Sequence, residues 1–139
     1  MADSTNTLDT GALKGFDPNA NLFPDDRYQG EIKKISNSEK GTTVVCTITD
    51  YQGTKEEGLK AIGKEISVFI NTKFDEKTPN FIKEQSLGLM YDLCNSLDIT
   101  PGDPVEEETL KGRIVIIAAK KRKDQYGRFQ MGIVHFDKA

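Results

Sequence analysis

Apolar and polar residues alternate along five segments of this 139-residue chain, as is typical of β-strands that bury one face. In the first segment Tyr28, Gly30 and Ile32 alternate with polar neighbours, and a glycine inside a strand indicates a bend or bulge. The fourth segment contains a continuous apolar run, which predicts a strand buried on both faces. We expect strands near residues 27–35, 42–51, 63–71, 112–122 and 128–136.

One further segment, residues 79–97, has the period of an amphipathic helix, with apolar residues recurring as far as Leu97. Thr78 is a suitable N-cap, and Pro79 suits the first helical position. We therefore expect one long helix between the third and fourth strands.

The resulting order is three strands, one helix and two strands. This order is typical of the OB-fold, a five-stranded Greek-key barrel, although other α+β domains share it. We expect a mainly β, OB-fold-like domain over residues 27–139. Residues 1–26 are rich in Asp, Asn, Thr, Gly and Pro, and they predict an acidic, flexible N-terminal arm.

The charge of the chain is segregated, although its net charge is only −3 and its pI is about 5.2. The arm has five aspartates against Lys14, whereas residues 111–128 have seven cations against Asp124. A local basic patch on an acidic chain can attract a polyanion to one face and repel it elsewhere.

The basic patch coincides with the predicted hairpin between the last two strands, where the OB-fold has part of its binding surface. Asp124-Gln125-Tyr126-Gly127 predicts the turn, and two aromatic rings lie near it in sequence. Cations bind phosphates and rings stack on bases, so the tip indicates nucleic-acid binding; a tip that only keeps the hairpin soluble is the alternative. The cations assigned to this site are Lys120, Lys121, Arg122, Lys123 and Arg128, joined by Lys33, Lys40 and Lys73.

Three aromatic residues are candidates for base stacking: Tyr126 at the tip, Phe69 and Tyr51. Strand alternation predicts that Phe69 and Tyr51 point away from the core. An outward phenylalanine needs a cover, which is either a base or Leu22 or Phe23 of the arm.

Nothing in the sequence indicates catalysis, a metal or a cofactor. His135 lies among apolar strand residues, and the acidic run Glu106–Glu108 is typical of a solvated connector. Cys46 and Cys94 lie in apolar patterns that predict core thiols in a reducing compartment, and a disulfide between them is the alternative. We expect a cytoplasmic protein that is not an enzyme and has no membrane span.

The chain also resembles a family, the small phage-encoded single-stranded-DNA-binding proteins of OB-fold type. The similar elements are Tyr28-Gln29-Gly30-Glu31-Ile32, Met90-Tyr91-Asp92-Leu93-Cys94, and Leu110-Lys111-Gly112-Arg113 before the basic hairpin. The resemblance implies a role in replication or recombination in the host cytoplasm. Many single-strand binders end in an acidic tail that recruits partners, whereas this chain ends Asp137-Lys138-Ala139.

These observations predict sequence-tolerant binding of single-stranded DNA. Replication or recombination proteins, and a second copy of the chain, are further candidate partners. An RNA-binding barrel and a structural or adaptor domain that docks a protein are the alternatives.

Overall fold

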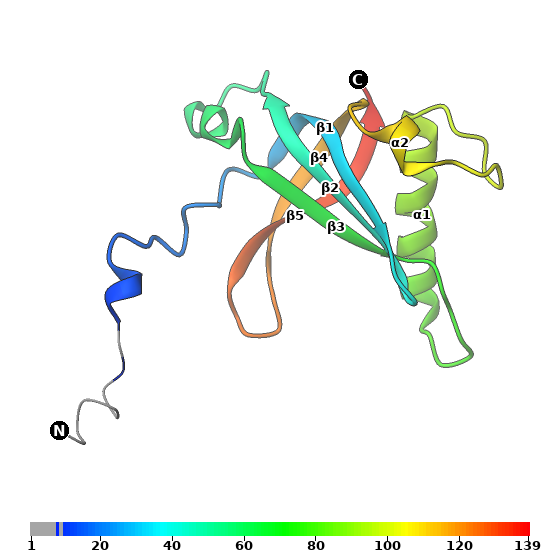
Figure 1. Ribbon diagram of the computed structural model, residues 1–139, viewed down its shortest axis with the longest axis horizontal. Helices are drawn as coiled ribbons and strands as arrows, with labels where there is room; N and C mark the ends of the chain where they lie inside the picture. The colour runs from blue at the N-terminus through cyan, green and yellow to red at the C-terminus, as the bar shows by residue number, and fades with distance from the viewer. Residues whose placement is uncertain (1–7, 9) are drawn as a thin grey trace.

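The computed structural model describes residue 8 and residues 10–139, which form five strands packed on one long helix (Figure 1). The strands are β1 Asp26–Asn37, β2 Gly41–Asp50, β3 Glu65–Asn71, β4 Ile114–Lys123 and β5 Phe129–Lys138. The helices are α1 Asn80–Ser96 and the short α2 Glu107–Leu110, with 3-10 turns η2 Gly11–Leu13 and η3 Glu56–Ala61.

The five strands form one sheet that closes into a ring, in the order β1-β2-β3-β5-β4 with β4 returning to β1. The neighbouring strands are antiparallel except β3 and β5, which are parallel and have one register pair, Ser67 and Gly132. The residues of β5 nearest the hairpin turn are paired with β4 and not with β3. The β4–β5 hairpin therefore extends out of the ring (Figure 1).

The inside of the ring is filled by apolar residues that alternate along the strands. Tyr28, Ile32, Val44, Cys46, Ile48, Ile66, Ile70, Val115, Ile117, Ile133 and Phe136 are all buried. The prediction that β4 is buried on both faces is wrong, because its buried residues alternate with half-buried ones. The register of β1 shifts between Gln29 and Gly30, which confirms the predicted irregularity, and β1 pairs with both β2 and β4. The predicted mainly β class, with one main helix between the third and fourth strands, is therefore confirmed.

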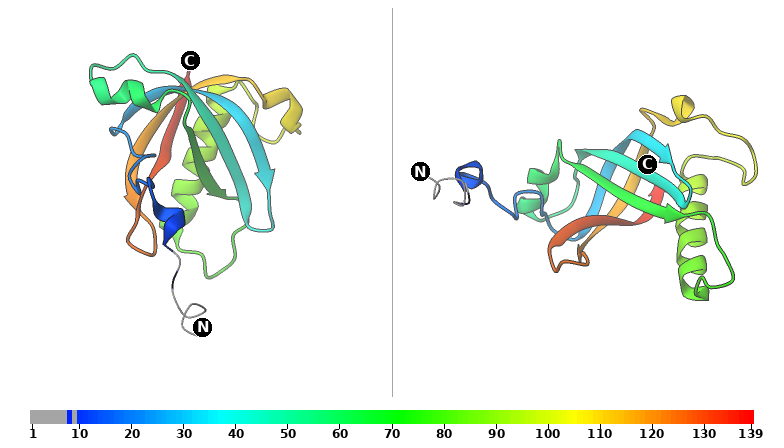
Figure 2. Two further views of the ribbon diagram at one scale, coloured as in Figure 1. Left: turned by 60° about the vertical axis from the view of Figure 1, so that its left-hand side comes forward. Right: turned by 60° about the horizontal axis from the view of Figure 1, so that its bottom comes forward.

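Helix α1 packs on β3 and β5 at one end of the ring (Figure 2). Leu93 of the helix and its C-cap residue Leu97 are both buried, and the Arg113 guanidinium donates to the Leu97 carbonyl at 3.1 Å. The predicted Thr78 cap is wrong: the helix begins at Asn80, and the Thr78 hydroxyl instead accepts from the Asp75 amide at 3.1 Å.

The last residues of the predicted arm, 23–26, are part of the folded domain. Phe23 is buried edge-on against Tyr28, with the ring centroids 5.0 Å apart. Asp25 accepts a hydrogen bond from the Lys121 amide at 2.7 Å, and Asp26 begins β1. We use the term arm below for residues 10–22, which are exposed apart from the half-buried Leu22.

Candidate nucleic-acid interface

The β4–β5 hairpin is held at its tip by the one acidic residue there. The Asp124 carboxylate accepts from the amides of Tyr126 and Arg128 at 2.8 and 3.0 Å, and from the Gln130 side chain at 3.2 Å. Gly127 supplies the positive φ of 80° that the turn requires. The predicted turn is therefore present, and the charge of Asp124 is engaged with donors from its own loop.

The four consecutive cations are divided between the two faces of the hairpin. Ala119 is buried in the ring, so by alternation Lys121 and Lys123 continue its inner face, whereas Lys120 and Arg122 point outward. All four side chains are exposed. We call these pairs the inner cations and the outer cations.

The inner cations are joined by an aromatic residue, Phe129, which was not among the predicted site residues. Phe129 lies opposite Lys123 in the register and is 45% exposed. The ammonium groups of Lys121 and Lys123 lie 5.1 and 5.2 Å from the centre of its ring, within cation–π range. The signal that could have found Phe129 is its pairing with Lys123, which follows only once the length of the turn is known.

On the outer side of the ring, Phe69 points into solvent as predicted and is 46% exposed. Its ring lies against the backbone of Gly41, where an added Cβ would come within 2.9 Å of the ring. The Lys40 carbonyl accepts from the amides of Thr72 and Lys73 at 3.2 and 3.3 Å. The loop between β1 and β2 and the end of β3 are thus joined beside Phe69, and this brings Lys40 and Lys73 to one place.

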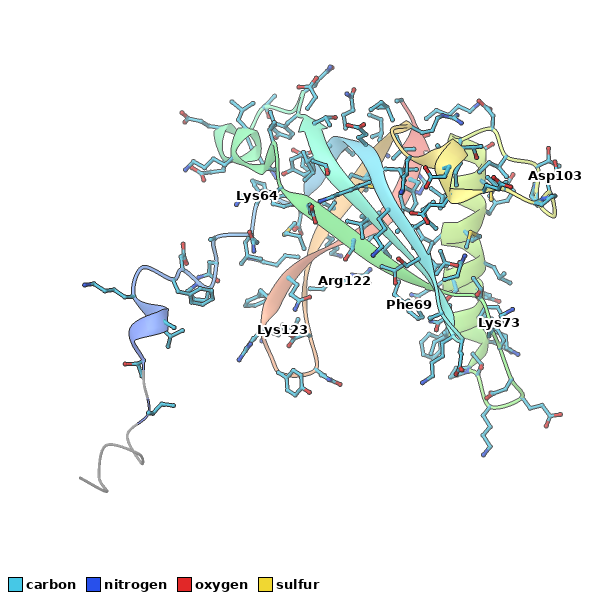
Figure 3. The ribbon with its side chains drawn as sticks, viewed as in Figure 1. Lys64, Phe69, Lys73, Asp103, Arg122 and Lys123 are labelled. Carbon is cyan, nitrogen blue, oxygen red and sulfur yellow. The ribbon has the colours of Figure 1, made fainter. Side chains whose placement is uncertain are left out.

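Arg122 is the outer cation that approaches Phe69. Both residues line a groove of about 470 Å³ between β3, β5 and α1 (Figure 3). The helix side of this groove includes Glu84 and Asp92. The Asp92 carboxylate forms a hydrogen bond with Nδ1 of His135 at 2.9 Å. The groove therefore has a cationic, aromatic side on the strands and an acidic side on the helix.

The prediction that Tyr51 points outward is wrong, since this residue is only 5% exposed. β2 ends at Asp50, so the strand alternation does not extend to Tyr51. Its ring stacks on Tyr28 with the centroids 5.0 Å apart, and its hydroxyl donates to Asp26 at 2.7 Å. Tyr51 is a core residue and is not available for stacking on bases.

The bond between Tyr51 and Asp26 shifts the pKa of both groups. The Tyr51 hydroxyl, helped by the Arg27 amide, lowers the pKa of the Asp26 carboxyl below its ordinary value. Burial, together with the bond to Asp26, raises the pKa of the Tyr51 phenol.

The remaining candidate residues are not gathered at the Phe69 groove. Lys33 forms an ion pair with Glu65, so part of its charge is already compensated. Tyr126 is exposed at the hairpin tip, and the neighbouring Arg128 lines a different groove. Leu22 and Phe23, proposed as covers of Phe69, lie elsewhere: Phe23 is in the core and Leu22 lines the groove that contains Arg128.

The acidic connector is occupied by an ion pair rather than arranged as a metal site. Glu107 and Glu108 both contact the Lys111 ammonium, at 3.5 and 3.2 Å. Within the described residues, no three His, Cys, Asp or Glu side chains lie close enough together to hold a metal ion.

Comparisons with known proteins do not assign a family. A scan against models of protein families and a search for similar curated proteins find no match for this chain. Among the helices of the described residues, none combines the length and apolarity that crossing a bilayer requires.

Proposed function

We propose that this protein binds single-stranded DNA without sequence preference, through an OB-fold of the phage-encoded type that it resembles. The strand order β1-β2-β3-β5-β4, the parallel contact of β3 with β5 and the position of α1 fit a five-stranded Greek-key barrel. In that fold the second and third strands and the loops 1–2 and 4–5 bind oligonucleotides.

The observation that carries the proposal is the convergence of these same elements around Phe69. Phe69 comes from β3, Lys40 from the loop between β1 and β2, and Arg122 from the base of the loop between β4 and β5. A half-exposed ring beside cations from two loops is the combination that a sequence-tolerant single-strand site needs.

In the proposed mechanism the outer cations, together with Lys40 and Lys73, contact phosphates, and one base stacks on Phe69. Glu84 and Asp92 on α1 repel phosphate and so confine the backbone of the strand to the β3 and hairpin side of the groove. Phosphate contacts carry no base information, which accounts for binding at all sequences alike.

The test is fluorescence anisotropy with single-stranded DNA, duplex DNA and RNA of equal length, each over a range of salt concentrations. The wild-type protein is expected to prefer the single strand. The double variant Lys120→Ala/Arg122→Ala should reduce the log–log salt slope by roughly 0.7 for each lost phosphate contact.

A matched control is Lys60→Ala/Lys111→Ala, which removes two cations that are paired with glutamates away from the hairpin. This control should keep the wild-type slope. Equal slopes for both double variants would show that the outer cations form only a solvated face, and a preference for RNA would reassign the ligand.

A second candidate function, docking of a protein partner, is favoured by one feature of α1. Leu87 and Tyr91, one helical turn apart, are both large and exposed. An apolar helix face of this kind suits a replication or recombination protein as a partner. Leu87→Lys should abolish such docking and leave the affinity for DNA unchanged.

We also place the protein in the cytoplasm, because Cys46 and Cys94 are both free thiols.

A further inference from the structure

An open groove of about 870 Å³ lies between the arm and the hairpin. One wall consists of arm residues from Leu13 to Leu22, and the other consists of hairpin residues 127–131, with Glu65 at the edge. In Figure 2 the arm passes beside the hairpin and not over β3. This groove is therefore separate from the groove beside Phe69, although the hairpin borders both.

The arm is attached to the domain at its C-terminal end. Phe23 is buried against Tyr28, and the Lys64 ammonium bonds to the Ala20 carbonyl. Consecutive turns shape the rest, including hydrogen bonds from the Phe16 amide to the Leu13 carbonyl at 2.9 Å and from the Leu22 amide to the Asn19 carbonyl at 3.0 Å.

The two walls have complementary chemistry for a nucleotide chain. On the hairpin wall, the ammonium groups of the inner cations, Lys121 and Lys123, lie over the ring of Phe129, and Arg128 precedes Phe129 in the chain. On the arm wall, Phe16 is 64% exposed, and an aromatic ring so open to water has little structural role.

The carboxylates near this groove are engaged with other groups of the protein, and Asp25 accepts a hydrogen bond from the Lys121 amide at 2.7 Å. Glu65 is paired with Lys33. The Asp17 carboxylate accepts from the Asn19 amide at 2.9 Å and lies outside the lining of the groove. Arg128 and the paired Glu65 are therefore the charged residues that line the groove, and the inner cations lie on the ring of Phe129 beside it.

We propose that the arm and the hairpin form the two walls of a second single-strand subsite, which binds bases against Phe16 and phosphates at Lys121, Lys123 and Arg128. This subsite rests on the proposed function, because it takes the continuation of the strand that lies beside Phe69. The hairpin then separates two successive segments of one strand, with its outer cations on the first and its inner cations on the second.

The subsite predicts a dependence on oligonucleotide length. A short strand fills only the Phe69 groove, whereas a longer strand crosses the hairpin and reaches the arm. The experiment measures the affinity of the wild-type protein and of Phe16→Ala for a series of single strands of roughly 4 to 16 nucleotides, the range of OB-fold site sizes. Phe16→Ala should equal the wild type for the shortest strands and bind the longest about five- to 150-fold more weakly, the range for one lost stacking contact.

Phe81→Ala is the matched control, because Phe81 lies on α1 away from the groove and is 63% exposed, almost the same as Phe16. Its affinities should equal those of the wild type at every length. A Phe16→Ala variant with wild-type affinity for long strands overturns the subsite, as does one that weakens all lengths equally. Tighter binding by Phe16→Ala also overturns it, since the arm would then compete with the strand.

These outcomes separate the subsite from the proposed function. If the wild-type protein binds no strand of the series, both fall. If the wild type binds and Lys120→Ala/Arg122→Ala weakens all lengths while Phe16→Ala changes none, only the subsite falls.

Discussion

Tyr51 and Phe69 hold the same position in the hydrophobic pattern, on the strand face opposite the core residues, yet their environments are opposite. Tyr51 is buried to 5% exposure at the end of β2, whereas Phe69 is 46% exposed within β3. The difference shows how far strand alternation can be used to assign a binding surface.

Phe69 obeys the alternation because its backbone is fixed by pairing on β2. It lies opposite Thr43, between the inward-facing residues Val68 and Ile70. With its backbone held in the sheet, the Phe69 side chain can only point outward.

Tyr51 lies just beyond the last residue of its strand, so no ladder determines its direction. Gly53 and Gly58 approach its ring so closely that a Cβ at either position would collide with it. The ring is therefore enclosed by Tyr28 on one side and by the following loop on the other. One residue of strand length thus decides between a core residue and a surface residue.

The largest expected effect is that of Tyr51→Ala on stability. Removing a buried aromatic side chain leaves a cavity, so Tm should fall by on the order of 10 °C. The measurement is thermal unfolding followed by circular dichroism, together with the affinity for single-stranded DNA per folded molecule, which should not change. An unchanged Tm together with weaker binding would show that Tyr51 contacts the nucleic acid and is not a core residue.

Phe69→Ala should show the reverse behaviour. Its Tm should change by no more than about 2 °C, because the ring is half exposed. Its affinity for single-stranded DNA should fall about five- to 150-fold, as for the loss of one stacked base. A lower Tm with unchanged affinity would mean that the binding face lies on another side of the ring of strands.

Phe69→Tyr is the conservative control for this variant. A tyrosine ring stacks on a base as well as phenylalanine does, so most of the affinity should be retained.

The smallest effect is expected for Tyr51→Phe, which keeps the ring and removes the bond to Asp26. The folded protein lowers the pKa of Asp26 below its ordinary value of 3.8. The Asp26 carboxylate therefore stabilises the fold at pH values above 3.8, and this contribution is lost as the pH falls through the pKa of the folded state. The pKa of the Tyr51 phenol is raised above its ordinary value of 10.0. The neutral phenol therefore stabilises the fold at pH values below 10.0, and this contribution is lost as the pH rises through the pKa of the folded state.

The stability difference between the wild type and Tyr51→Phe should therefore be greatest between these two pH values and should narrow on both sides. Urea unfolding at pH 3, 7 and 11 measures it. A difference that is equal at all three pH values would show that the Asp26 bond contributes nothing through ionisation.

The sequence also did not predict how the four consecutive cations are divided between the two faces of the hairpin. The turn and the basic run were predicted correctly, because Asp124 and Gly127 are local signals. The hairpin cations divide into an outer pair, of which Arg122 lies beside Phe69, and an inner pair on Phe129. This division depends on which face of β4 enters the ring, and a one-residue shift would exchange the two pairs.

The sequence by itself determined the strands, the main helix and the core residues within the strands, because alternation and helical period are properties of neighbouring residues. It predicted the outward direction of the Phe69 side chain correctly for the same reason. Only the tertiary structure decided that Tyr51 is buried, that Phe129 joins Lys121 and Lys123, and that the arm borders the hairpin. These contacts join residues distant in sequence, and they follow from strand ends, register and ring closure, which no local pattern contains.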